Sequence, residues 1–215
     1  MSNINYNYIG EYIRSILPED SIKLKEIKTY ADNEHVPIIC PEVGQLIKVL
    51  LNITNSKNIL EIGTAIGYSS ILMAEATNSN TKITTIEKRN DMVEIAKKNI
   101  KESNYDERIK IIMGDAREIL PQLEEKYDFI FLDAAKGHYL DFFNKCSRIL
   151  KKDGVILSDN VLYKGMVAND ELVVRRKKTI VKRMKNYLEY LSRLENYSTA
   201  IIPIGDGVAL TYKKE

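Results

Sequence analysis

Oxygen-bearing side chains follow two short apolar runs in the second half of the chain. Asp133 ends the run DFIFLD, and Asp159 and Asn160 end the run GVILSDN. If both runs form neighbouring parallel strands, these three side chains meet at one edge of a sheet. A set of this kind, without His or Cys, suits a hard cation such as Mg²⁺, although aspartates at strand ends also cap helices. Lys136 follows closely and is either a base above the same crevice or a solvated lysine.

Three further positions could hold a ligand that contains adenosine. The segment EIGTAIGYSS places Gly63 before a serine-bearing helix start, where the backbone can approach a ligand. It is neither G-x-G-x-x-G nor a Walker loop, and alone it also fits an ordinary strand-to-helix turn. Glu87 ends the next apolar run, where an acid can accept hydrogen bonds from ribose hydroxyls. Asp115 and Ala116 follow the third run, where they either read an adenine edge or begin a helix with Asp115 as its cap.

These positions require strands and helices in alternation, and the residue pattern predicts such a framework. Short apolar segments alternate with helical stretches, which is typical of parallel strands buried on both faces. The expected parallel strands are 58–63, 82–87, 109–114, 128–133 and 154–159.

Both ends of the chain depart from this alternation. Helices are expected at 8–17, 21–33, with Ser21 as its N-cap, and about 42–53, and a long amphipathic helix is expected over about 170–195. The segments STAIIPI and VALTYKK, joined by GDG, predict a closing antiparallel hairpin. The sequence therefore predicts one Rossmann-like, doubly wound α/β domain over residues 1–215, with a seven-stranded mixed sheet and a helical amino-terminal region at 1–55.

Composition and charge narrow the classes of function. The 32 basic and 30 acidic residues give a formal net charge of +2, which alone does not indicate a nucleic-acid partner. Two cysteines and two histidines cannot furnish a conventional zinc site and fit a reducing compartment. No signal-peptide pattern and no apolar run of about 20 residues is present, so we expect a soluble, cytoplasmic protein without a membrane partner.

One strongly basic segment, RRKKTIVKRMK at 175–185, contains no acidic residue. It is either the solvated face of an amphipathic helix or a surface that neutralises nucleic-acid phosphates. The candidate RNA-binding residues in it are Arg175, Arg176, Lys177, Lys178, Lys182 and Arg183.

The segments LEIGTAIGYSS, GDAREILPQL, DAAKGHY and GVILSDNVLYKG together resemble the cation-dependent, catechol-type class I O-methyltransferases, which use S-adenosylmethionine. The resemblance covers nearly the whole chain and implies the class I methyltransferase fold. It implies a cation, Mg²⁺ or another such as Mn²⁺, held by Asp133, Asp159 and Asn160, with Lys136 as the general base. The acid with which catechol-type members grip a free catechol has no evident equivalent in the tail IGDGVALTYKKE. The implied cofactor-binding residues are Ile39, Glu61, Gly63, Ser69, Glu87, Asp115, Ala116 and Asp133.

Within this family, EHVPI, SDNVLYKGMVA, TAIIPIGDG and the basic segment are similar to the bacterial tRNA methyltransferases that convert 5-hydroxyuridine at wobble position 34 to 5-methoxyuridine. This likeness implies a tRNA anticodon loop as substrate and a homodimer. A separate hypothesis is that Tyr163 or Tyr139, expected near the crevice, stacks on a base. The alternative is a small-molecule catechol or caffeoyl-type O-methyltransferase. A more distant alternative, an NAD-dependent Rossmann oxidoreductase, lacks its G-x-G-x-x-G motif and leaves the strand-end acids without a role. A non-catalytic adenosine-binding protein is also open.

Overall fold

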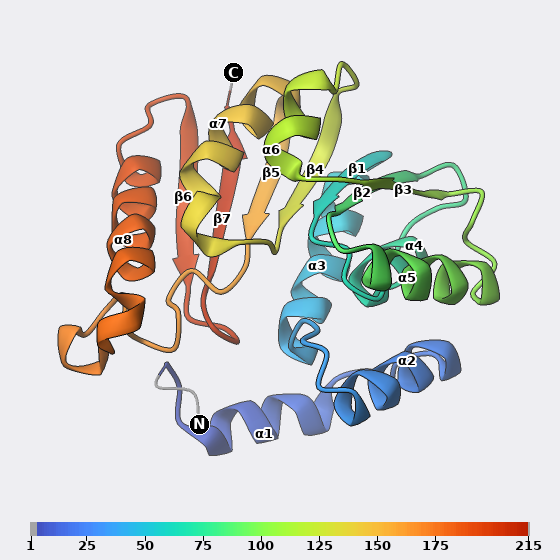
Figure 1. The fold of residues 1–215 in the computed structure, drawn as a ribbon, viewed down its shortest axis with the longest axis horizontal. Helices are drawn as coiled ribbons and strands as arrows, with labels where there is room; N and C mark the ends of the chain where they lie inside the picture. Colours follow the sequence, from blue (N-terminus) through green and yellow to red (C-terminus); the bar gives the residue numbers. More distant parts are fainter. Residues whose placement is uncertain (1–3, 215) are drawn as a thin grey trace.

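The computed structural model describes residues 4–214 and contains one seven-stranded sheet in the order β3-β2-β1-β4-β5-β7-β6 (Figure 1). Strands β1 to β5 are parallel, whereas β7 runs antiparallel to both β5 and β6. The predicted doubly wound mixed sheet with a carboxyl-terminal hairpin is therefore confirmed. The strands are β1 Asn58–Ile62, β2 Lys82–Glu87, β3 Ile109–Met113, β4 Tyr127–Leu132, β5 Leu150–Ser158, β6 Tyr197–Ile202 and β7 Val208–Lys213.

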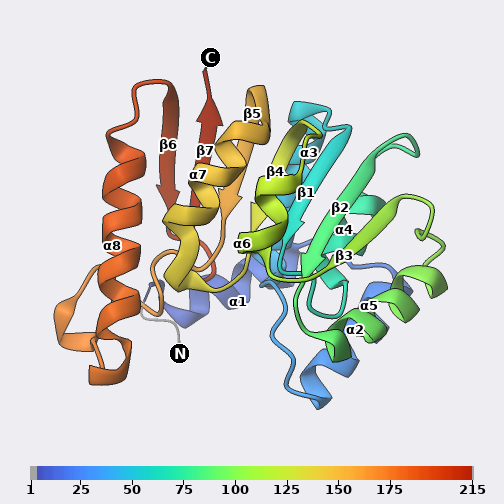
Figure 2. The same cartoon turned by 45° about the horizontal axis from the view of Figure 1, so that its top comes forward.

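Helices cover both faces of the sheet and create two apolar cores (Figure 2). One core lies under α2, α3, α4 and α5, and the other lies under α6, α7 and α8. These helices, with α1, are α1 Asn7–Ile16, α2 Ile22–Asn33, α3 Pro41–Thr54, α4 Tyr68–Glu75, α5 Asn90–Glu102, α6 Ala116–Ile119, α7 Tyr139–Ile149 and α8 Lys178–Ser192. Within residues 4–214, every helix is too short or too polar to span a lipid bilayer.

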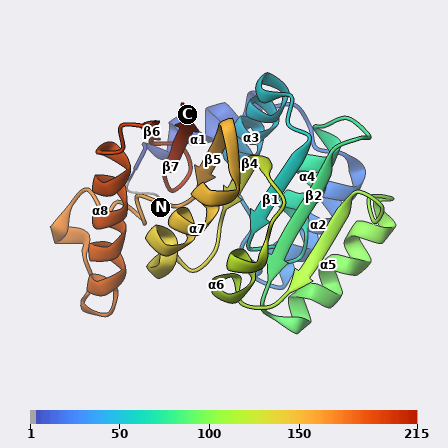
Figure 3. The same cartoon turned by 90° about the horizontal axis from the view of Figure 1, so that it is seen from above.

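The central strand β4 shows why the strand segments are continuously apolar. Phe129 and Phe131 enter the core under α3 and α4, whereas Ile130 and Leu132 enter the core under α7 and α8. Because side chains alternate between the two faces of a strand, both sets are buried only when helices cover both faces. The same order places a switch point between β1 and β4, from which the chain winds outward in both directions (Figure 3). Ligand crevices of open α/β sheets form at this point, beyond the strand carboxyl ends.

The helix predicted over 170–195 is wrong in its first part. Residues Asp170–Leu172 and Arg175–Lys177 form two single 3-10 turns, η3 and η4, and the α-helix begins only at Lys178. Val173 and Val174, which lie between the turns, adopt extended backbone angles, as β-branched residues favour. Arg175–Lys177 therefore lie on a turn that leads into α8 and not within a helix.

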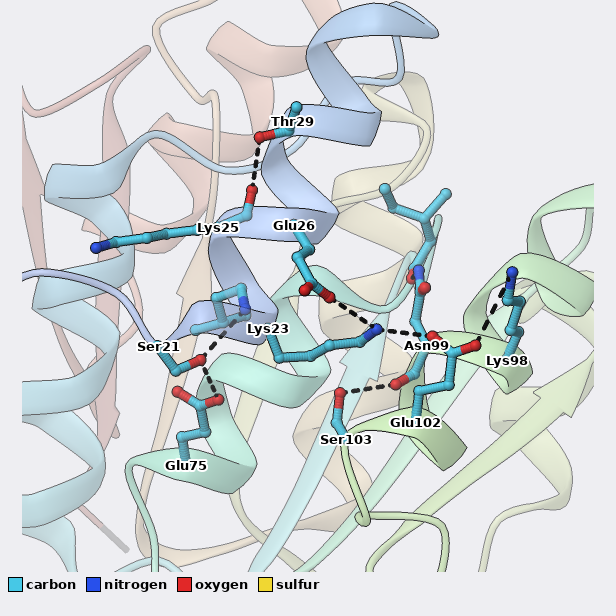
Figure 4. Close-up of polar contacts among 12 residues, drawn as sticks. Ser21, Lys23, Lys25, Glu26, Thr29, Glu75, Lys98, Asn99, Glu102 and Ser103 are labelled. Atoms are coloured by element: carbon cyan, nitrogen blue, oxygen red, sulfur yellow. Dashed lines mark hydrogen bonds and ion pairs between the residues drawn. The ribbon is translucent and has the colours of Figure 1, made fainter.

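Polar contacts fasten α2 to α4 and α5 (Figure 4). The Ser21 hydroxyl accepts a hydrogen bond from Leu24 N, which confirms the predicted N-cap, and donates to Glu75 of α4 at 2.7 Å. Lys23 lies between Glu26 of α2 and Glu102 of α5, with N–O distances of 3.2 and 2.7 Å. These contacts surround the buried apolar face of α2, so the amino-terminal region is joined to the sheet layer.

Helix α1 is attached differently, because none of its residues is buried. It lies beyond the carboxyl ends of β4 and β5 (Figure 1). The Arg14 guanidinium forms a two-pronged ion pair with Glu42 of α3, at 2.9 and 3.0 Å, and the Glu42 side chain is only 6% exposed. Asn5, just before the helix, donates to the carbonyl of Pro203. Polar contacts therefore help to attach α1 to the rest of the domain.

We predict that Arg14→Ala lowers the free energy of unfolding by about 1–3 kcal/mol at pH 7, because the buried Glu42 carboxylate loses its ionic partner. Burial is the largest single influence and raises the pKa of Glu42, but the hydrogen bonds from Arg14 and the backbone, together with the positive charges of Arg14 and Lys28, leave the pKa below its ordinary value. The pair therefore stabilises the fold above the ordinary glutamate pKa, and this contribution disappears as the pH falls through the lowered pKa. Urea unfolding at pH 7 and at about pH 3 measures the difference.

Lys25→Ala is the matched control, because it breaks an ion pair with Glu19 in which both side chains are largely exposed. It should change stability by less than about 0.5 kcal/mol. An Arg14→Ala effect that is the same at both pH values would contradict the ionic explanation.

Candidate active site

A cavity of about 400 Å³ opens at the carboxyl ends of the parallel strands. Its wall is built from the segments that follow β1 to β5 and from residues 37–40, which precede α3. All of the predicted catalytic and metal-binding residues line it, together with most of the predicted cofactor-binding residues. The predicted residues on the wall are Ile39, Gly63, Glu87, Asp115, Ala116, Asp133, Lys136, Asp159 and Asn160.

Gly63 allows the ends of β1 and β4 to approach each other closely. Its φ of +108° is one that residues with side chains rarely adopt. A Cβ atom there would lie 2.1 Å from the carbonyl oxygen of Asp133. Glycine is therefore required for both the backbone angle and the contact, and it leaves the main chain of β1 exposed to the cavity.

Glu87 presents a fixed carboxylate at the end of β2. One carboxylate oxygen accepts a hydrogen bond from Ala65 N at 3.0 Å, and the other accepts from the N–H groups of Lys88 and Arg89, both at 2.9 Å. A carboxylate offers about four lone-pair positions, and three N–H donors occupy three of them here, so about one position remains for a hydroxyl. This geometry suits the role predicted for Glu87 in holding a ribose.

Asp115 is an N-cap, one of the two roles left open by the sequence. Its carboxylate accepts from Arg117 N at 2.9 Å and from the Arg117 guanidinium at 2.7 and 3.0 Å. The hydrogen bond from the guanidinium is the main reason that the pKa of Asp115 lies far below its usual range. Asp115 and Ala116 also line the cavity, so adenine contact stays a prediction alongside the cap.

Two carboxylates and one amide meet between the ends of β4 and β5. Asp159 is 2% exposed, and its carboxylate accepts from Asn160 N at 2.6 Å. Burial raises the pKa values of Asp159 and Asp133, and repulsion from Asp133 raises that of Asp159 further. A cation between them would relieve this repulsion.

The donor set fits a hard cation. Asp133, Asp159 and Asn160 offer only oxygen atoms, which Mg²⁺ and Mn²⁺ prefer. Within residues 4–214, no three His, Cys, Asp or Glu side chains gather at one point. Two carboxylates and an amide would leave coordination positions for oxygens of the substrate.

Lys136 lies on η2 (Lys136–His138), the single turn before α7, and its ammonium group donates to Asn160 Oδ1 at 2.8 Å. Helix α8 packs against this turn, and the Arg183 guanidinium donates to Gly137 O at 3.3 Å. The amino group of Lys136 is thus held beside the oxygen donors and at the cavity wall. A role as general base stays a prediction.

Glu61 and Ser69, predicted to bind the cofactor, lie behind the cavity wall. Glu61 is fully buried, and its carboxylate accepts from the hydroxyls of Ser69, Ser70 and Thr85, the last at 2.6 Å. Burial raises the pKa of Glu61 to about 7. In this structure the two residues fasten the start of α4 to β1 and β2, and their direct contact with a cofactor stays a prediction.

The two tyrosines predicted near the crevice differ sharply. Tyr139 is 1% exposed, and its hydroxyl donates to the carbonyls of Leu132 and Asp159, so the prediction that it stacks on a base is wrong. Tyr163 lies in the loop after Asn160, with the ammonium of Lys177 5.7 Å from its ring centre. Tyr163 therefore joins the site loop to the basic segment.

Several residues that line the cavity are not among those predicted from the sequence. His138 and Phe142, whose ring centres are 5.9 Å apart, form an apolar part of the wall beside Ala116. His138 belongs to the segment DAAKGHY, which assigns it no role, and Phe142 reaches the cavity through the position of α7. Cys40 also lines the wall, and burial is the main reason that its pKa is raised to about 11.

Residues 15–214 match the family model described as O-methyltransferase. The chain belongs to the O-methyltransferase family. The enzyme is 33% identical over 176 residues to a catechol O-methyltransferase from Niastella koreensis, covering 79% of this chain and 80% of the relative. It is 30% identical over 222 residues to a caffeoyl-CoA O-methyltransferase from Medicago sativa, covering 97% of this chain and 88% of the relative.

Solved structures agree with this assignment. A Staphylococcus aureus protein superposes on the methyltransferase with a TM-score of 0.90 and 35% identity, over 96% of this chain and 99% of that one. An O-methyltransferase from Bacillus cereus, solved in complex with SAH, gives a TM-score of 0.85 and 27% identity, over 96% and 97% of the two chains. The class I methyltransferase fold is thereby confirmed for this O-methyltransferase.

We predict that Glu87→Ala weakens binding of S-adenosylhomocysteine to the methyltransferase by about 10- to 100-fold, because the ribose loses hydrogen bonds to an ionised acceptor. Isothermal titration calorimetry measures the affinity. Glu94→Ala, an exposed acid on α5, is the matched control and should leave it unchanged. An affinity of Glu87→Ala within twofold of the wild type would contradict the assignment of the ribose to Glu87.

Proposed function

We propose that this O-methyltransferase transfers the methyl group of S-adenosylmethionine to a hydroxyl that has a second oxygen beside it, and that it requires a divalent cation. The observation that carries the proposal is the meeting of Asp133, Asp159 and Asn160 with Lys136 in the cavity that also contains Glu87. Oxygen donors, an amine and a ribose acceptor are the groups that such a transfer needs.

Each residue has a separate task in this mechanism. Glu87 holds the ribose, and the exposed main chain at Gly63 admits the methionine portion of the cofactor. When bound, a cation on Asp133, Asp159 and Asn160 would supply Lewis acidity that stabilises the ionised substrate hydroxyl. The neutral Lys136 amine takes the hydroxyl proton, and the substrate oxygen then bonds to the methyl carbon as the bond from that carbon to the sulfonium sulfur breaks, which leaves S-adenosylhomocysteine. Positioning inside the cavity and exclusion of water supply much of the rate.

Catechol-type phenols are the first substrate candidate. Two vicinal oxygens on one ring match the requirement for adjacent oxygens, and the names of the Niastella and Medicago relatives support this class. In a caffeoyl-CoA substrate the phenol is attached to coenzyme A, a carrier that bears phosphates. The cavity itself is of a size that suits a cofactor with a small aromatic group beside it.

5-Hydroxyuridine in a tRNA anticodon loop is the second candidate, because its 5-oxygen and 4-carbonyl also lie side by side. The basic segment favours it. Lys185 pairs with Asp170 and Arg183 contacts Gly137 O, but several exposed basic side chains lie on η4 and the first turns of α8. These turns adjoin η2, which carries Lys136, so phosphates bound there would lie near the reacting groups. The exposed basic side chains are Arg175, Arg176, Lys178, Lys182 and Arg183.

Methyl transfer from labelled S-adenosylmethionine to a catechol and to tRNA containing 5-hydroxyuridine tests both candidates. We predict that EDTA and Asp159→Ala each lower the rate by at least about 100-fold, because the substrate oxygen loses its electrophilic partner. The matched control is Asp106→Ala, an exposed acid remote from the cavity lining. Labelling that survives EDTA and Asp159→Ala would contradict the cation requirement, and the labelled substrate identifies the class.

The basic segment gives a second prediction. If tRNA is the substrate, alanine at Arg175, Arg176 and Lys178 raises KM for tRNA by about 10-fold or more and flattens its salt dependence, because fewer counterions are released. KM for a catechol stays unchanged. The control is alanine at Lys97, Lys98 and Lys101 on α5, at the opposite end of the sheet from α8 (Figure 2). Equal effects of the two triple variants on tRNA would contradict a specific surface.

A further inference from the structure

The loop that begins at Asn160 is docked on the turn between β6 and β7. Val161 N donates to Gly207 O at 2.8 Å, and Leu162 N donates to Asp206 O at 3.0 Å. The carboxylate of Asp206 accepts a third hydrogen bond, from Lys164 N. Three of the four residues from 161 to 164 are therefore held by two residues of one turn.

This docking stabilises an unfavourable backbone. Asn160, Tyr163 and Lys164 all have positive φ, at 54°, 45° and 58°, although none of them is glycine. Each such residue costs on the order of 1 kcal/mol, so the loop needs fixed partners to keep this path. Neither a helix nor a sheet ladder includes residues 160–167.

The turn is shaped for this contact. Gly207 has a φ of +81°, and a Cβ atom there would lie 2.4 Å from Leu162 Cγ. The Asp206 side chain is half-buried; burial raises its pKa, whereas the positive charges of Lys136 and Lys164 lower it. The carboxylate is thus close enough to feel the charge of Lys136, yet it is not part of the cavity wall.

We propose that Asp206 is a positioning residue of the cation site: by holding Lys164 N, it fixes the loop so that the Asn160 amide oxygen stays directed at Lys136 and at the cation. This inference rests on the cation site of the proposed function. Asp206 acts through Asn160 and does not itself bind the cation. This positioning depends on the Asp206 oxygen that accepts the hydrogen bond from Lys164 N and not on the negative charge of the carboxylate.

Three variants separate these possibilities. Asp206→Ala removes the acceptor, whereas Asp206→Asn keeps an oxygen that can accept from Lys164 N but loses the charge. Gly207→Ala disturbs the same loop through Leu162 without changing any charge. Asp170→Ala is the matched control, because it removes an exposed acid from the same half of the molecule.

The test is a titration of each full-length protein with Mn²⁺, followed by electron paramagnetic resonance, beside calorimetry with S-adenosylhomocysteine. We expect Asp206→Ala and Gly207→Ala to weaken Mn²⁺ binding by about 10-fold or more, with S-adenosylhomocysteine affinity within about twofold of the wild type. Asp206→Asn and Asp170→Ala should retain Mn²⁺ affinity within about threefold. At saturating Mn²⁺, Asp206→Ala should regain most of its kcat.

The outcomes that overturn the proposal are distinct. Unchanged Mn²⁺ affinity in Asp206→Ala removes the positioning role while leaving the cation site intact. Equal losses in Asp206→Asn and Asp206→Ala show that the charge acts, which also overturns the proposal. A wild-type protein that binds no Mn²⁺ overturns the cation site and the positioning role together. Parallel loss of S-adenosylhomocysteine binding in Asp206→Ala assigns the effect to misfolding and overturns the specific role as well.

Discussion

The close contact between the ends of β1 and β4 is the constraint on which the site depends. Gly63 brings the chain against the Asp133 carbonyl at the switch point of the sheet, so the end of one strand faces the end of its neighbour. Most of the residues assigned to the cofactor lie on or after β1, β2 and β3, whereas those assigned to the cation follow β4 and β5. A larger residue at Gly63 would separate the two halves, and neither half alone could perform methyl transfer.

Burial decides how the polar groups around this contact behave. Glu61, Asp133 and Asp159 are carboxylates in surroundings that favour their neutral forms, and hydroxyls or neighbouring N–H groups offset part of that cost. The three differ in their partners. Glu61 has three hydroxyl donors and links α4 to β1 and β2, whereas Asp159 accepts from Asn160 N and lies close enough to Asp133 to be repelled by its charge. A buried carboxylate therefore supports the fold in one place and prepares a cation site in another.

Much of the framework could be predicted, because the strands are buried on both faces and thus read as continuous apolar runs bounded by polar residues. Because each apolar run ends at a polar residue, the pattern also predicted that Glu87, Asp133 and Asp159 lie at strand ends. Spacing could not show that Val173 and Val174 interrupt the expected helix, nor that Tyr139 turns inward, since tertiary packing decides both. The contact of Asp206 with Lys164 was also out of reach, because it joins residues 42 positions apart.

The docking of the Asn160 loop on the β6–β7 turn has a consequence for synthesis on the ribosome. The strands that carry the cofactor-facing residues emerge first, and their cores can form around β1, β2 and β4 before the last strands appear. The turn at 205–207 belongs to the final segment of the described chain. A nascent chain that ends before β6 would thus lack the partner of the loop after Asn160, so this part of the site can take its final path only once the last two strands have been made.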